Sequence, residues 1–292
     1  MTPAEGSEAT AVLTHTFTDL AEGNEAEAVL AHALTCLAQG RPDPITGSST
    51  VSLSERCVEV PWVAGQLTDA KRLLDIGYSM APPEWMGVLL ATQDRGTHLT
   101  GIDIVDPQRV RTRYPAELVE RVLATPIRVE SILDAKPTDG TYDTITCVST
   151  LEHIGFDIAT PPETTDTAYV RATQAEDAVA TRDPQTDRAF LDAVARLLCP
   201  GGSLLLSVPA GKGGAILHQD SLGLFTYQFE YGQADWEAIT SDDRFQLTQE
   251  AFFRHDQECG WEQVGDFDQL TDQSSAMRPF ATACAMARLT LR

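Results

Sequence analysis

Carboxylates and a glycine stand directly after apolar segments of this chain. Residues 73–76 are apolar except for Asp75, and Gly77 follows them. A second segment, residues 98–102, is followed by Asp103. A strand that stops at a glycine turn lets the backbone pass close beneath a bound ligand. An acid at the end of the next strand can accept both hydroxyls of a ribose. The two segments together indicate a nucleotide-type site.

Two later segments end in polar residues that could complete such a site. Ser131, Ile132 and Asp134 follow the third apolar run and could border an adenine ring. His153 follows the fourth run, and His218 lies in the long segment after the fifth. Histidine is the natural proton acceptor at neutral pH, so both are candidate catalytic bases. The alternatives left open are a structural hydrogen-bonding role for His153 and an exposed loop position for His218.

The elements that would position these residues alternate between strand-like and helix-like patterns. We expect strands at residues 72–77, 98–104, 127–132, 142–149, 203–208, 261–267 and 282–291. We expect helices at residues 20–39, 84–93, 116–124, 188–198 and 247–260. This order predicts an α/β fold with a Rossmann-like, mostly parallel seven-stranded sheet, helices on both faces and an antiparallel last strand.

The same patterns divide the chain into two regions. We expect residues 1–56 to form an N-terminal helical extension and residues 57–292 to form the main domain. Within that domain, residues 156–187 interrupt the periodicity with seven carboxylates, two arginines and three prolines. Such a segment is typical of a surface insertion. It leaves from the ligand side of the sheet, so a lid and an inert insertion are both open.

The amino-acid composition of the chain limits the classes of molecule that it is expected to bind. Among 292 residues, 43 acids against 21 bases give a net charge of −22, which disfavours a nucleic-acid partner. There is no 18-residue apolar run and no secretory signal pattern, so we expect no membrane span and a cytoplasmic location. The six cysteines form no C-x-x-C pair, so we expect no metal site and no disulfide framework.

Five short motifs in the same order carry a resemblance to a known family. They are LLDIG (73–77), GID (101–103), GTYD (140–143), LEH (151–153) and LCPGG (198–202). Together they span the strand ends described above, and the likeness extends over residues 59–267. In this order and spacing they resemble the class I S-adenosylmethionine-dependent methyltransferases.

The resemblance implies S-adenosyl-L-methionine as cofactor and assigns residues to it. It places Gly77 under the methionine part and Asp103 on the ribose hydroxyls. It puts the adenine near Ile104 and near Ser131, Ile132 or Asp134. The remaining positions that it implies around the cofactor are Glu59, Asp75, Tyr78 and Ser149. The chain departs from the family in the first turn, where residues 78–81 replace further glycines and would bring the Tyr78 and Met80 side chains to the ligand.

The implied activity is methyl transfer to a small molecule, with an oxygen of a sugar, lipid or secondary metabolite as the expected acceptor. Aromatic residues at 225–236 could line the acceptor pocket, with Tyr227, Tyr231 and Trp236 favoured over Phe225 and Phe229. The alternative is a catalytically inactive binding or scaffold protein with the same fold. A nicotinamide oxidoreductase is disfavoured because its phosphate-binding turn needs glycines. The oligomeric state is open, and a homodimer is one option.

Overall fold

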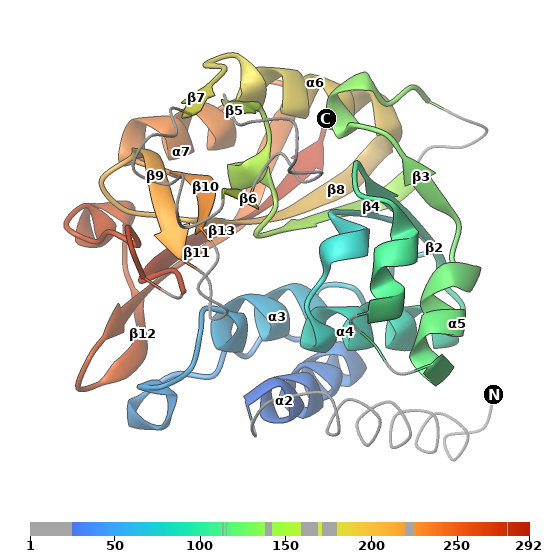
Figure 1. Cartoon of the computed structure of the whole chain (residues 1–292), viewed down its shortest axis with the longest axis horizontal. Helices are drawn as coiled ribbons and strands as arrows, with labels where there is room; N and C mark the ends of the chain where they lie inside the picture. The colour runs from blue at the N-terminus through green and yellow to red at the C-terminus, as the bar shows by residue number, and fades with distance from the viewer. Residues whose placement is uncertain are drawn as a thin grey trace.

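The computed structural model describes residues 25–112, 114, 116–137, 142–158, 169–170, 180–219, 225–278 and 280–292. Its main feature is an eight-stranded sheet, with the strand order β12-β11-β13-β8-β4-β1-β2-β3 (Figure 1). The strands are β1 (Arg72–Ile76), β2 (His98–Asp103), β3 (Ile127–Val129), β4 (Tyr142–Val148), β8 (Leu198–Pro209), β11 (Phe245–Asp256), β12 (Gly260–Val264) and β13 (Ala283–Leu291).

Strand direction agrees with the predicted fold class. Strands β8, β4, β1, β2 and β3 pair in parallel, and β13 joins the sheet antiparallel to β8. The prediction of a Rossmann-like, mostly parallel sheet with an antiparallel last strand is therefore confirmed. Parallel strands bring their carboxyl ends to one edge, which is where such sheets bind ligands.

The eighth strand corrects the sequence analysis, which expected a helix at residues 247–260. These residues lie mostly in β11, which pairs antiparallel with both β12 and β13. Phe252 packs into the core on one face of the sheet and Phe253 into the core on the other. Consecutive apolar side chains that point to opposite faces follow the two-residue period of a strand. The flanking polar residues hid that period.

Helices cover both faces of the sheet. Figure 1 shows one group of helices on one face and a second group on the other. The first group is α2 (Glu25–Gln39), α3 (Arg56–Ala64), α4 (Pro83–Asp94) and α5 (Ala116–Ala124), and the second is α6 (Thr186–Leu197) and α7 (Gln233–Thr240). Each group packs against its own apolar cluster. The part of the predicted helix 20–39 before Glu25 lies outside the described residues.

Two smaller sheets lie beside the carboxyl edge. One pairs β10 (Phe225–Glu230) with β9 (Gly214–Gln219) and β6 (Tyr169–Val170), and the other pairs β5 (Phe156–Ile158) with β7 (Ala180–Arg182). The described parts of the insertion 156–187 are strands β5 and β6 and the continuous segment 180–187, which holds β7 and the start of α6. The remaining insertion residues, and with them the lid hypothesis, lie outside the described residues.

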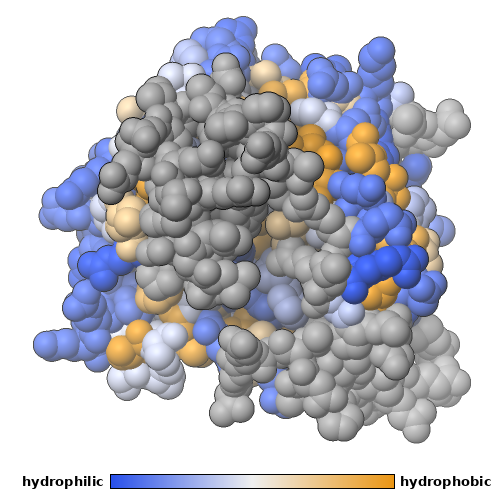
Figure 2. Space-filling view, in the orientation of Figure 1, coloured by the Kyte–Doolittle hydropathy of each residue, from blue (hydrophilic) through white to orange (hydrophobic). Residues whose placement is uncertain are grey.

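The surface reflects the acidic composition. Hydrophilic residues dominate the periphery of the face shown in Figure 2, with apolar residues in separate patches. In the described part of the chain, every helix is too short or too polar to cross a bilayer. The described side chains also form no group of three or more His, Cys, Asp or Glu residues that could hold a metal ion.

Candidate functional site

A cavity of about 540 Å³ lies at the carboxyl ends of β1, β2 and β4. Gly77 and Asp103 line it from the first two strand ends, and Ser149 and His153 line it from the fourth. Segments that are far apart in sequence therefore meet at one edge because their strands are parallel neighbours. The cavity brings together most of the residues that the sequence analysis selected.

The first turn is held by the acid at the end of β2. Gly77 is left-handed with φ of 89° and begins the short 3₁₀ helix η2 (Tyr78–Met80). Asp103 accepts the backbone N–H of Ser79 at 2.9 Å through Oδ2 and that of Val105 at 2.9 Å through Oδ1. Burial raises the pKa of Asp103, and these N–H groups oppose the rise. Asp103 thus fixes the turn while it lines the cavity.

The Tyr78 side chain lies away from the cavity. Its ring is fully buried, and its hydroxyl donates to the Val122 carbonyl of α5 at 3.3 Å. A Cβ atom at Gly101 would stand 2.5 Å from Cγ of this ring, so the ring occupies the space left by that glycine. Of the two side chains expected at the ligand, Met80 lines the cavity and Tyr78 packs behind β2. Sequence spacing alone did not show that Gly101 makes this room.

Asp75 lies in the core beside the cavity. Its Oδ1 accepts bonds from Trp85 Nε1 at 3.1 Å and Thr146 Oγ1 at 2.7 Å, and Trp85 itself lines the cavity. Among the described residues, Oδ2 has no hydrogen-bond partner. Burial raises the pKa of Asp75 to about 7 because the neutral donors only partly replace water. Asp75 therefore holds a proton readily near neutral pH.

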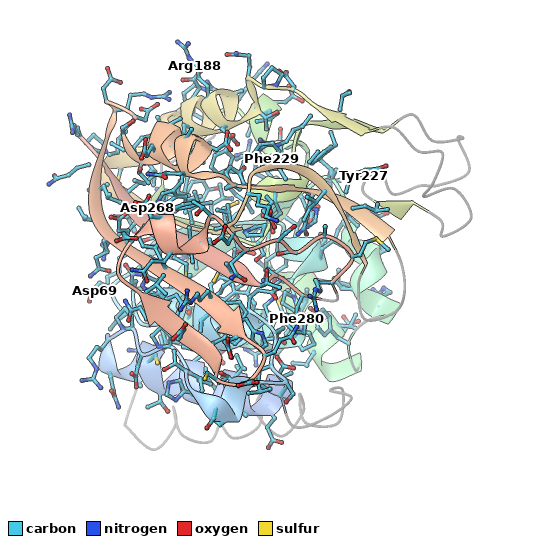
Figure 3. The ribbon with its side chains drawn as sticks, turned by 90° about the vertical axis from the view of Figure 1, so that its left-hand side faces the viewer. Asp69, Arg188, Tyr227, Phe229, Asp268 and Phe280 are labelled. Atoms are coloured by element: carbon cyan, nitrogen blue, oxygen red, sulfur yellow. The ribbon has the colours of Figure 1, made fainter. Side chains whose placement is uncertain are left out.

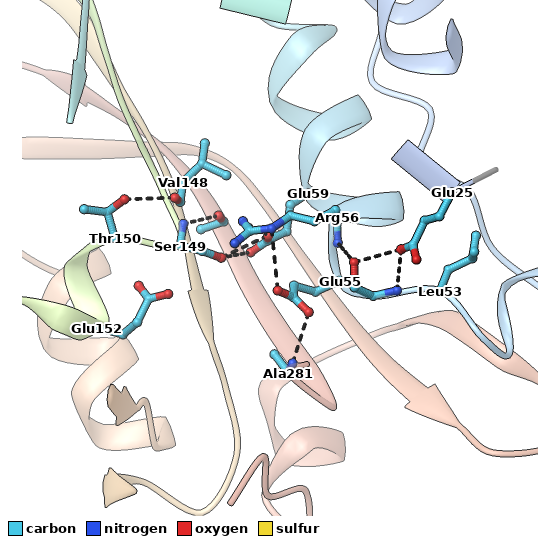
Figure 4. Close-up of polar contacts among 12 residues, drawn as sticks. Glu25, Leu53, Glu55, Arg56, Glu59, Val148, Ser149, Thr150, Glu152 and Ala281 are labelled. Carbon is cyan, nitrogen blue, oxygen red and sulfur yellow. Dashed lines mark hydrogen bonds and ion pairs between the residues drawn. The ribbon is translucent and has the colours of Figure 1, made fainter. Parts of the chain in front are cut away.

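Helix α3 brings a cation to the cavity that the sequence analysis missed. Arg56 lines the cavity, and its Nη1 donates to Glu59 Oε2 at 3.0 Å (Figure 4). Burial raises the pKa of Glu59 to about 7, against the opposing effect of Arg56. Glu59 stands behind Arg56 rather than in the cavity wall. The sequence signal was their spacing of three residues on a helix, which a search confined to strand ends overlooks.

Ser149 connects this helix to the end of β4. It has a left-handed backbone with φ of 42°, a conformation that is costly for a residue other than glycine. Its Oγ donates to the Glu59 carboxylate, 2.8 Å from Oε1 and 3.0 Å from Oε2, and its backbone N–H donates to Ser207 Oγ at 3.2 Å. These contacts hold the strained residue in the cavity wall.

The residues that follow β2 and β3 form the outer wall. Ile104, Ser131 and Ile132 line the cavity, and Ile104 is 61% exposed at its rim. Ser131 Oγ accepts the backbone N–H of Leu133 at 3.2 Å and so caps η4 (Ile132–Asp134). Asp134 ends that short helix and is not among the described lining residues. Glu130, which the sequence analysis did not select, lines the cavity instead.

His153 is the histidine on the cavity wall. It ends η5 (Leu151–His153), and its Nδ1 lies 3.1 Å from the backbone carbonyl of Tyr227 on β10. A carbonyl can only accept, so Nδ1 carries the hydrogen and Nε2 is the basic nitrogen. Glu152 Oε1 lies 4.0 Å from Nε2. Burial raises the pKa of Glu152 well above its ordinary value.

The other predicted catalytic and acceptor residues are not among the described residues that line the cavity. The backbone of His218 belongs to β9, opposite Thr226 of β10, and its side chain lies outside the described residues. Tyr231 and Trp236, expected in the acceptor pocket, are buried in the core, where Trp236 packs against Phe252 and Phe267. Burial of these large rings by α6, α7 and β11 was not visible in their local spacing.

Comparison with known proteins gives a family match over the site. The family described as "Methyltransferase domain" matches residues 54–251. A search of curated proteins finds no match. Among solved structures, the chain is similar to an S-adenosylmethionine-dependent methyltransferase from Methanosarcina mazei, with 15% identity, 76% of this chain and 92% of that chain covered, and a TM-score of 0.45.

Two further solved structures have ligands in their descriptions. The Burkholderia thailandensis 1,6-didemethyltoxoflavin-N1-methyltransferase with bound 1,6-didemethyltoxoflavin and S-adenosylhomocysteine is 12% identical, covers 100% of this chain and 91% of its own, and has a TM-score of 0.45. CalS10, an S-adenosylmethionine-bound amino pentose methyltransferase from Micromonospora echinaspora, is 15% identical, with 75% and 84% covered and a TM-score of 0.39.

Proposed function

The chain belongs to the class I S-adenosylmethionine-dependent methyltransferases, and we propose that it methylates an oxygen of a small molecule such as a sugar, a lipid or a secondary metabolite. One observation carries the proposal: Gly77 and Asp103 meet His153 on the walls of a single cavity. A glycine turn and a ribose-type acid suit the cofactor, and a basic imidazole nitrogen suits a proton-bearing acceptor.

The residues present fit the cofactor. Asp103 lines the cavity while its carboxylate accepts backbone N–H groups, and a carboxylate at this strand end suits the hydroxyls of a ribose. Ile104, Ser131 and Ile132 offer an apolar wall with a polar edge for the adenine. Arg56 would face the methionine carboxylate. When bound, the cofactor supplies an electrophilic methyl group.

A buried atom supports the same fit. Asp75 Oδ2 has no partner among the described residues, although Trp85, which hydrogen-bonds Oδ1, lines the cavity. Buried carboxylate oxygens without partners are rare in folded proteins and call for an explanation. A cationic group bound beside Trp85 would stabilise the Asp75 carboxylate. We assign this place to the methionine ammonium group.

The role of His153 is to remove the proton of the acceptor. Its Nδ1 hydrogen is held by the Tyr227 carbonyl, so Nε2 takes up the proton as the acceptor oxygen becomes a nucleophile. The buried Glu152 borders the imidazole on that side, with its Oε1 4.0 Å from Nε2. The descriptions of two similar structures name small molecules, 1,6-didemethyltoxoflavin and an amino pentose, which is the class of acceptor proposed here.

Calorimetric titration of the full chain with S-adenosylmethionine, S-adenosylhomocysteine and NAD tests the proposal. We expect both sulfur ligands to bind and NAD to give no heat. Transfer of a labelled methyl group to a panel of sugars, phenols and hydroxylated lipids then identifies the acceptor. Silence toward both sulfur ligands would overturn the proposal and favour a scaffold protein. Binding of NAD alone would indicate an oxidoreductase.

A further inference from the structure

Arg182 lies at the end of β7, outside the cavity, and contacts the turn that carries His153. Its Nε donates to the Ile154 carbonyl at 3.0 Å, and its Nη2 donates to the Leu151 carbonyl at 3.4 Å. One guanidinium therefore holds the backbone on both sides of His153. The side chain is 5% exposed, so water does not compete strongly for these bonds.

Three further residues fix the direction of that guanidinium. Asp187 at the start of α6 accepts from Nη1 at 3.1 Å and from Nη2 at 2.6 Å. The Tyr231 hydroxyl accepts from Nη2 at 2.9 Å and donates to Asp187 Oδ1 at 2.9 Å. Cζ lies 4.4 Å from the centre of the Phe229 ring. Phe229, labelled in Figure 3, belongs to β10 and is partly buried against the core. A two-pronged ion pair stacked on a ring has little freedom to turn.

The chain around this cluster is also closely packed. Phe156 of β5 pairs with Arg182 of β7, and the Asp183 N–H donates to the Gly155 carbonyl at 2.9 Å. Gly155 is left-handed with φ of 82°, and a Cβ atom there would collide with the Thr186 side chain. Strand pairing, a hydrogen bond and side-chain packing therefore hold both ends of the insertion next to η5.

These contacts converge on the imidazole. His153 is held on its backbone by the carbonyls that Arg182 binds and on its ring by the Tyr227 carbonyl. Tyr227 and Phe229 are on the same strand, so the guanidinium that stacks on Phe229 fixes η5 relative to β10. If η5 moved, Nδ1 of His153 would lose its hydrogen bond to the Tyr227 carbonyl. The ring could then carry its hydrogen on either nitrogen.

We propose that Arg182 is a positioning residue that, with Asp187 and Tyr231, holds His153 in the tautomer with a basic Nε2. The proposal rests on the proposed function of His153 as the proton acceptor. It also gives the insertion a role, because Arg182 and Asp187 lie at its C-terminal end. The position of η5 then depends on how that end of the insertion is anchored.

The test compares Arg182→Lys with Arg244→Lys. Lysine keeps the positive charge, but its single ammonium group cannot replace the planar guanidinium, which donates to two carbonyls and a carboxylate at once. Arg244 is a matched control because it makes its own two-pronged pair with Asp242 and an ion pair with Asp192, without contact to η5. The readout is ¹H–¹⁵N correlation of the imidazole rings, with His153 assigned from a His153→Gln variant.

We expect the wild type and Arg244→Lys to show the Nδ1–H tautomer of His153, and Arg182→Lys to show a mixture. Affinity for S-adenosylhomocysteine should be unchanged in Arg182→Lys, whereas kcat in methyl transfer should fall on the order of 10- to 100-fold. An unchanged His153 spectrum in folded Arg182→Lys would overturn the inference. If that variant does not fold, Tyr231→Phe, which keeps the ion pair, decides the question in the same way.

The two proposals fail separately. If the wild type does not bind S-adenosylhomocysteine, the proposed function is wrong, while the tautomer of His153 still reports on Arg182. If the wild type binds it and Arg182→Lys keeps the wild-type spectrum and kcat, only the positioning role is wrong.

Discussion

The two walls of the cavity are held together in different ways. The wall formed by β1 and β2 is fixed by hydrogen bonds from backbone N–H groups to Asp103, close to the residues that line it. The wall formed by η5 is fixed from outside by a buried ion pair on the insertion and α6, and by the Tyr227 carbonyl on β10. We expect changes in the first wall to alter cofactor affinity and changes in the second to alter turnover.

The two buried acids beside these walls show the same contrast. Asp75 receives two side-chain hydrogen bonds from neutral donors on Oδ1, and Glu152 lies beside His153; among the described residues, each of the two acids has one carboxyl oxygen without a hydrogen-bond partner. Burial raises the pKa of both. The first acid lies beside the wall expected to bind the cofactor, whereas the second lies beside the proposed base. The following predictions test this division.

The largest effect is expected at the second wall. His153→Gln should lower kcat on the order of 10²- to 10⁴-fold, because the acceptor loses its proton acceptor. Affinity for S-adenosylhomocysteine, measured by calorimetry, should stay close to the wild-type value. His98→Gln, at an exposed position at the start of β2, is the control. If His153→Gln had the wild-type kcat, the proposed catalytic role of the second wall would be wrong.

Asp75→Asn should change how stability depends on pH. The folded protein keeps the Asp75 proton up to a pKa of about 7, whereas the unfolded chain loses it near pH 4. Stability from this group is therefore complete below about pH 4 and is lost as pH rises to about 7.

Asparagine cannot ionise, so the variant should gain stability relative to wild type as pH rises across that range. The gain should be at most about 4 kcal/mol, at about 1.4 kcal/mol per pKa unit. Urea unfolding of the ligand-free protein at a series of pH values measures it. Parallel curves for the two proteins would contradict a raised pKa at Asp75.

Asp103→Ala should weaken S-adenosylhomocysteine binding on the order of 10- to 100-fold, since hydrogen bonds to a charged group contribute about 1.5–3 kcal/mol. Asp106→Asn is the control because Asp106 caps the next, exposed turn through Gln108. Wild-type affinity in Asp103→Ala would refute the ribose assignment and, with it, the view that the first wall determines cofactor binding.

The smallest effect is expected on stability, in the core behind the wall formed by β1 and β2. Gly101→Ala should destabilise the protein by about 1–3 kcal/mol, because the new Cβ meets the Tyr78 ring. The double variant Tyr78→Ala/Gly101→Ala should cost less than the sum of the two single changes, as measured by urea unfolding. Additive losses would show that the ring and the glycine do not share the space.

The sequence was sufficient for the strand ends and much less so for the surroundings of the site. The apolar runs that end at Gly77, Asp103 and His153 identified the correct strands, since the strand period and turn residues are local properties. Residues 247–260 were expected to form a helix, and only the packing of Phe252 and Phe253 on opposite faces of the sheet shows that they form a strand.

The sequence by itself thus determined the order of the strands' functional ends and the family of the fold. Tertiary structure alone decided that Tyr78 turns away from the cavity, that Arg56 reaches it from a helix, and that Arg182 holds the turn of His153. The reason is physical: turn and strand preferences act over a few neighbouring residues. The hydrogen bonds that hold Tyr78, helix α3 and Arg182 in place join residues between 28 and 90 positions apart and form only after the sheet is assembled.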